Sequence, residues 1–215
     1  MTLFDQIVLL LTGLVAIYMI WHLYGKQKNK STAAPLNVYA MVSFAVLLVA
    51  GLLLIFLGWN ILGLLGHGSQ ESLFVAVVAG LIPFSLATGL VSKFYAEHEK
   101  KYLGLMIVGL VLIAVTKYGG FTSLSKVVYP LFHAIAGLTI FFVPIIAVKS
   151  GKAKSALINV TIGGTLIGLG GIALGFLTVG KQLLFFSGEF VLMILAPLLF
   201  LTALFFALGL VKGDG

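Results

Sequence analysis

The sequence has no cysteine, no arginine and only six acidic residues among its 215. The absence of cysteine excludes disulfides, thiolate metal sites, iron–sulfur clusters and thiol redox chemistry. Charged residues make up only 9% of the chain, whereas a soluble domain carries about 25%. So few charges cannot cover a surface that faces water, so lipid must be the solvent around most of the chain.

Complete catalytic motifs are also missing. The sequence shows no Ser/His/Asp set and no metalloprotease motif, and the last apolar stretch carries no lysine at its middle for a retinal Schiff base. The run Glu97-His98-Glu99 lies between charged residues and is predicted to be a solvated loop. Whether the chain is an enzyme therefore stays open.

What the sequence does contain is seven apolar stretches. We predict an all-α integral membrane protein, a single transmembrane domain over residues 1–215 with seven helices. The shortest stretch, residues 103–118, only just suffices, because about 16 residues rising 1.5 Å each barely span a hydrocarbon core of about 30 Å. The predicted helices cover about residues 3–24, 38–59, 73–91, 103–118, 127–148, 156–179 and 183–211.

The lysines indicate how the helices cross the membrane. Ten of the 13 fall in alternate gaps and at the C-terminus, against three acidic residues, whereas the other gaps and the N-terminus carry three lysines and three acidic residues. The positive-inside rule then predicts an outside N-terminus and a cytoplasmic C-terminus, in a prokaryotic cytoplasmic membrane. Because the lysines are scattered in loops, we expect contact with anionic lipid and no binding of nucleic acid.

Seven helices permit two parallel groups of three joined by one crossing helix, as in some transporters. The two thirds of the sequence show no clear self-similarity. Prolines 83, 144 and 197 all lie in helices predicted to run inward. Proline is common in membrane helices, where neighbouring helices satisfy the freed carbonyls, and that is the interpretation favoured here.

His133 is the first candidate for chemistry, because an ionisable side chain within hydrocarbon is costly. Small and aromatic residues surround it, with Gly137 one turn later. The nine residues from Tyr129 to Gly137 resemble haem-binding helices of membrane b-type cytochromes, in which histidine ligates iron and small residues admit the porphyrin. That resemblance implies His133 as a haem b ligand. The alternative is a hydrogen bond to a neighbouring helix.

The other three histidines suggest how haem ligands would pair. By topology, His67 and His133 are both outer, whereas His22 and His98 are both inner. One b-type haem at each face would give a transmembrane electron carrier. The positions of His67 and His98 in loops oppose this idea, since bis-histidine ligands come from rigid helices. His22 has an alternative as an interfacial residue within an aromatic belt.

Other polar residues and a glycine face complete the candidates. Glu189 and His133 both lie near the outer face and are predicted to be able to meet, while Asn159 adds a polar group toward the inner side. Alternatively, Glu189 is an interfacial carboxylate. A small-residue face on one helix is predicted to pack within the bundle or against a partner, or to make space for a flat cofactor or quinone tail. It consists of Gly164, Gly168, Gly171 and Gly175.

Three functions follow as hypotheses. The leading one is a membrane subunit of a respiratory-type electron-transfer system that binds b-type haem or a quinone, with His133 as its first site residue. The second is a structural subunit of a larger membrane complex, or a homo-oligomer, without catalysis. The third is a transporter or channel for a small solute, which would need a water-accessible cavity lined by Glu189, Asn159 or Ser85.

The topology predicts which loops a membrane-impermeant thiol reagent reaches. A single cysteine at Ser69 should be labelled from outside intact cells, and one at Ser150 should not, because lysine-rich loops stay in the cytoplasm. The chain has no cysteine of its own, so each variant carries one reactive thiol. The reverse pattern would refute the orientation.

Overall fold

The computed structural model describes residues 1–62, 73–178, 181–184 and 186–213. In this part of the chain, seven helices are long and apolar enough to cross a membrane, and no strand occurs. The predicted all-α class is thereby confirmed, whereas the orientation of the termini stays a prediction. The helices are α1 Leu3–Lys28, α2 Pro35–Leu57, α3 Leu73–Phe94, α4 Glu99–Tyr118, α5 Thr122–Lys149, α6 Ile158–Thr178 and α7 Gly188–Lys212. Three short 3₁₀ turns are η1 Trp59–Leu62, η2 Ala96–His98 and η3 Ser155–Leu157.

The ends of several helices differ from the ends of the apolar stretches. Helix α1 continues through Lys28, beyond the predicted end at Tyr24, because polar residues extend a helix into the interface. Helix α7 begins only at Gly188, since the Ser187 hydroxyl caps it by accepting a hydrogen bond from the Phe190 amide. A capping side chain, rather than the edge of the hydrophobic run, therefore sets where α7 starts.

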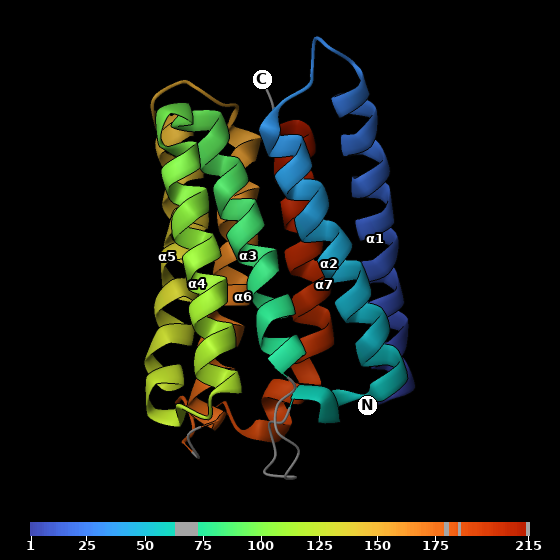
Figure 1. The fold of residues 1–215 in the computed structure, drawn as a ribbon. Helices are drawn as coiled ribbons and strands as arrows, with labels where there is room; N and C mark the ends of the chain where they lie inside the picture. The colour runs from blue at the N-terminus through green and yellow to red at the C-terminus, as the bar shows by residue number, and fades with distance from the viewer. Residues whose placement is uncertain (63–72, 179–180, 185, 214–215) are drawn as a thin grey trace.

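Six of the helices form a ring, and α4 lies outside it. Around the ring the packing order is α1, α2, α3, α5, α6, α7 and back to α1, while α4 packs against α3 and α5 (Figure 1). If α1, α2 and α3 change places with α5, α6 and α7 respectively, the packing order around the ring stays the same. Because α4 crosses the bundle once, corresponding helices run in the same direction. The bundle thus contains two three-helix units, α1–α3 and α5–α7. Their packing order is the one that a two-fold axis parallel to the helices would produce.

The lysines divide the bundle into two ends. The end where α1, α3, α5 and α7 finish holds the ten lysines named by the topology argument and lies opposite the N-terminus (Figure 1). We call it the lysine-rich end, and the other the lysine-poor end. Lysines in this region are 26, 28, 30, 93, 100, 101, 149, 152, 154 and 212.

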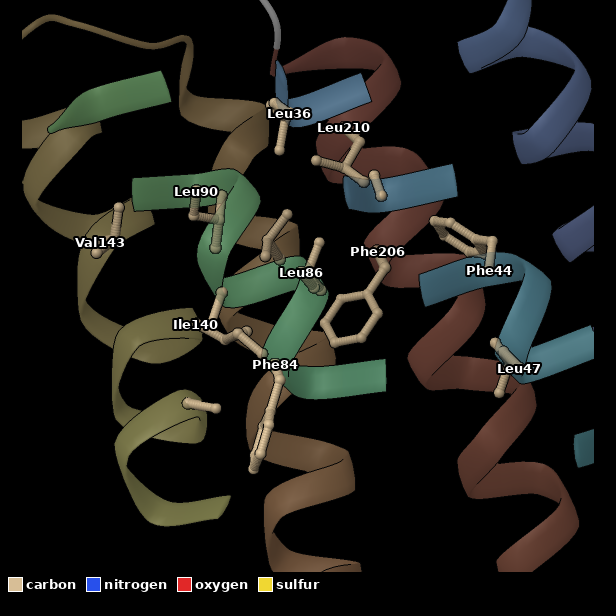
Figure 2. Packing of buried hydrophobic residues seen from close by; sticks show 14 of the residues in the cluster. Leu36, Phe44, Leu47, Phe84, Leu86, Leu90, Ile140, Val143, Phe206 and Leu210 are labelled. Carbon is tan, nitrogen blue, oxygen red and sulfur yellow. The ribbon is translucent and has the colours of Figure 1, made fainter. Parts of the chain in front are cut away.

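Buried apolar side chains fill the ring. One cluster draws on all seven helices, and in Figure 2 Phe206 of α7 reaches toward Leu86 of α3, with Phe44 on α2 beside them. A smaller cluster near the lysine-poor end joins α1, α2 and α7 through Leu9, Leu54 and their neighbours. The described core is therefore packed by large side chains and contains no charged group at its centre.

Helices α6 and α7 pack closely because glycines remove side chains from the contact. A Cβ atom on Gly209 would lie 2.8 Å from the Val160 amide nitrogen, and one on Gly163 would lie 3.1 Å from the Thr202 carbonyl oxygen. Such contact replaces the hydrophobic drive that lipid removes. Both glycines lie outside the face predicted from the sequence.

The predicted glycine face makes only one described contact inside the bundle. Gly164 packs against Ile140 of α5, where a Cβ would lie 2.7 Å from the Ile140 Cγ2 atom. Gly168 and Gly171 have open space beside them, and the side-chain surroundings of Gly175 lie outside the described residues. Packing of this face against another protein stays a prediction.

Several hydroxyl side chains form hydrogen bonds within the bundle, whereas the buried Thr202 hydroxyl has no partner. Thr88 donates to the Phe84 carbonyl oxygen of its own helix, at 2.7 Å. Between helices, Ser43 donates to Ile82 at 2.9 Å and Tyr102 donates to the Thr139 hydroxyl at 2.8 Å. These bonds keep polar groups away from hydrocarbon, where each unsatisfied group costs several kcal/mol, roughly.

The glycine contacts predict a difference between two alanine substitutions. Gly209→Ala should destabilise the protein by about 1–3 kcal/mol, because the new methyl group collides with the backbone of α6. Gly168→Ala, where nothing lies within 4 Å, should leave thermal unfolding in detergent unchanged and serves as the control. Equal unfolding temperatures for the two variants would contradict the described packing of α6 against α7.

Candidate functional site

His133 lies about three turns into α5, and its ring orientation is fixed by its own helix. The Nδ1 atom is 3.0 Å from the carbonyl oxygen of Tyr129, one turn earlier. A carbonyl oxygen only accepts hydrogen bonds, so Nδ1 carries the proton in this bond. In the neutral imidazole, Nε2 is then left with a lone pair.

Aromatic rings surround this imidazole. The Tyr129 ring stacks on it, with 4.0 Å between centroids and 27° between planes, and the Phe84 ring of α3 lies at 5.3 Å, tilted by 56°. Gly80 of α3 lies beside the imidazole, since a Cβ there would lie 3.7 Å from the His133 Cε1 atom, an ordinary contact, and 3.3 Å from a side-chain carbon of Leu110 in α4. Helices α3, α4 and α5 therefore meet at the half-buried imidazole.

The ammonium group of a lysine also lies near the Tyr129 ring. The Lys117 ammonium nitrogen lies 6.0 Å from the centroid of the Tyr129 ring. This is the outer range of a cation–π contact. Lys117, Tyr129 and His133 form a column that runs from the lysine-poor end into the bundle, and we call it the His133 site.

His22 and His98 lie apart from one another in the described bundle. His22 stacks on Tyr18 of the same helix with 5.8 Å between centroids, and its Nε2 is buried without a hydrogen bond. Its helix, α1, packs against α2 and α7. His98 is exposed in η2, with Nδ1 3.1 Å from a Glu97 carboxylate oxygen, and η2 packs against α3 and α4.

Of the residues predicted to lie near the outer face with His133, the structure describes Glu189 but not His67. His67 lies outside the described residues, so its pairing with His133 stays a prediction. Glu189 is exposed in the first turn of α7, a helix that packs against α6 and α1 rather than α5. Asn159 is half-buried at the start of α6 and donates to the Ala156 carbonyl oxygen at 2.8 Å. Neither residue is brought to His133.

Sequence reasoning missed the residues that form the walls of the His133 site. Tyr129 carried a usable signal, because residues four apart share a helix face. Gly80 and Phe84 are also four apart, but nothing in the sequence tells that this face of α3 points toward α5. Predicting that Gly80 and Phe84 border His133 would therefore have required the packing order of the helices.

The donor set of the His133 site limits what it can hold. Among the described residues no group of three His, Asp or Glu side chains is close enough to bind a metal ion. His133 thus offers one lone pair, which can bond to one position on a haem iron or accept a hydrogen bond from a hydroxyl group. Its aromatic neighbours suit a flat ring beside it.

Comparisons with known proteins do not indicate a family for this chain. No protein-family model, curated protein or solved structure matches the chain. A function is therefore inferred from the His133 site and from the arrangement of the helices.

Proposed function

We propose that the chain is the membrane subunit of an electron-transfer system and that it binds a quinol at the His133 site. The observation that carries this proposal is the bond from Nδ1 to the Tyr129 carbonyl oxygen, which leaves Nε2 as an acceptor. A quinol hydroxyl is a donor, so it is the matching partner. The rings of Tyr129 and Phe84 suit the flat quinol ring.

The position of α4 supports an entry for such a lipid-soluble molecule. Helix α4 lies outside the ring and packs against both α3 and α5 (Figure 1). Its outward residues, among them Leu105, Val108 and Leu112, are exposed to the surroundings. An isoprenoid tail lying along α4 would stay in lipid while the ring reaches His133.

The chemistry explains why the chain would act as a subunit. Oxidation of a quinol releases two protons and two electrons. His133 can accept one of these protons at the Nε2 lone pair, and the other proton passes to water at the lysine-poor end of the bundle. The electrons need a redox centre on a partner, because without cysteine this chain holds no iron–sulfur cluster.

Binding of a short-tailed quinol analogue to the purified protein tests the proposal. His133→Ala should weaken binding about tenfold, because losing one buried hydrogen bond costs roughly 1–1.5 kcal/mol. His98→Ala is the matched control, since this histidine is exposed in η2. Unchanged affinity in the His133 variant, or an equal loss in both variants, would refute quinol binding at this site.

Haem b is the second candidate, because the Nε2 lone pair can also bond to iron. The two are separated by an oxidised and a dithionite-reduced visible spectrum of the protein in mild detergent, with native membranes as a control for cofactor loss. If His133 ligates haem, His133→Ala should remove or shift the reduced absorption bands while the bundle stays folded. A haem spectrum that is unchanged in this variant would exclude His133 as the ligand.

The two three-helix units favour a third candidate, a transporter, since some transporters consist of parallel repeats. Pro83 and Pro197 lie in corresponding helices, α3 and α7. Ser85, one of the residues expected to line a cavity, however donates to the Leu81 carbonyl oxygen of its own helix. Faster uptake of a small solute by proteoliposomes than by protein-free vesicles would support this candidate over the quinol site.

A further inference from the structure

A groove of about 460 Å³ opens at the lysine-rich end, away from the His133 site. It lies between the end of α1, the first turn of α2 and the first residue of α4. The groove is shallow and open to its surroundings, so it can hold only part of a larger molecule. Residues that matter for its chemistry are Gln27, Ala33, Pro35, Val38, Tyr39 and Glu99.

One part of the groove is polar and held in place. The Tyr39 hydroxyl donates to a Glu99 carboxylate oxygen at 3.0 Å, which links α2 to α4. The Gln27 side-chain oxygen accepts from the Ala34 amide at 3.1 Å and from the Asn37 side chain at 3.2 Å. A carboxylate accepts several hydrogen bonds, so Glu99 can bind a further donor within the groove.

The other part of the groove is apolar and continues along α2. Val38 lines it and is 42% exposed, and Val42, one turn further into the membrane, is 41% exposed. Val49 follows two turns later on the same face and is 48% exposed. The groove is therefore continuous with an apolar, exposed stripe of α2 that starts at Val38.

Charges of both signs occur in or next to the groove. Glu99 places a carboxylate inside it, and Lys100 and Lys101, the next two residues, are exposed. A cationic group of a ligand would complement Glu99, and an anionic group on the same ligand would be attracted by the two lysines that follow Glu99 in the sequence. A phospholipid headgroup with a primary amine offers both, as an ammonium and a phosphate joined by two carbon atoms.

We propose that this groove binds a phospholipid with an ethanolamine headgroup. The ammonium donates to Glu99, the phosphate faces Lys100 and Lys101, and the acyl chains follow the Val38–Val49 stripe. A choline headgroup has no N–H to donate, and a glycerol headgroup brings no cation to the carboxylate. The proposal is independent of the quinol at the His133 site.

Native mass spectrometry of the delipidated protein with phosphatidylethanolamine, phosphatidylcholine or phosphatidylglycerol added one at a time tests the proposal. The wild-type protein should retain phosphatidylethanolamine at least about tenfold better than either other lipid, as expected for a hydrogen bond between charged groups. Glu99→Gln should abolish that preference. Glu97→Gln should keep it, because Glu97 is exposed in η2 and lies beside His98 rather than in the groove.

Tyr39→Phe gives a second variant that preserves every charge. It removes the hydroxyl that orients Glu99, so the preference for phosphatidylethanolamine should fall without disappearing. Equal retention of phosphatidylethanolamine and phosphatidylcholine by the wild type would overturn the proposal. Stronger retention of phosphatidylglycerol, or an equal loss in the Glu97 and Glu99 variants, would overturn it as well, since either result indicates attraction by the lysines alone.

Discussion

Hydrocarbon offers no partner for a hydrogen bond, and the arrangement of this bundle follows from that constraint. Serine and threonine hydroxyls bond to carbonyl oxygens of their own or neighbouring helices, as Thr88 and Ser43 do. Helices that cannot gain stability by leaving water instead gain it by close contact, which Gly163 and Gly209 allow between α6 and α7. The same constraint sets the tautomer of His133.

Against this background, the polar atoms that bond to nothing are informative. Among the buried side chains that the structure describes, only His22 Nε2 and the Thr202 hydroxyl lack a hydrogen-bond partner. His133 differs from both, because its Nδ1 atom is held by the Tyr129 carbonyl oxygen and its ring lies beside Gly80 of a neighbouring helix. An oriented imidazole beside a glycine suits ligand binding better than an imidazole that merely lacks a partner.

The sequence was sufficient to predict the seven helices, because lengths of apolar sequence report directly on the membrane. It could not predict which helices touch, since these helices are apolar on all sides and periodicity carries little information on their facing. Val108 and Ile113 of α4 illustrate this, because both are β-branched and apolar, yet Val108 is 52% exposed and Ile113 is fully buried. For the same reason His133 and Tyr129 were accessible to sequence reasoning, whereas Phe84 was not.

The His133 site lies where the two three-helix units contact one another, with residues from both units around it. The two units meet at two junctions, α3 with α5 and α7 with α1. Helix α4 covers the first junction, and no described helix lies outside the second in that way. His133 lies at the covered junction, between Gly80 of one unit and Leu110 of α4. The site is thus formed where one helix of each unit meets α4, the helix without a counterpart, so neither the α1–α3 unit nor the α5–α7 unit could build it alone.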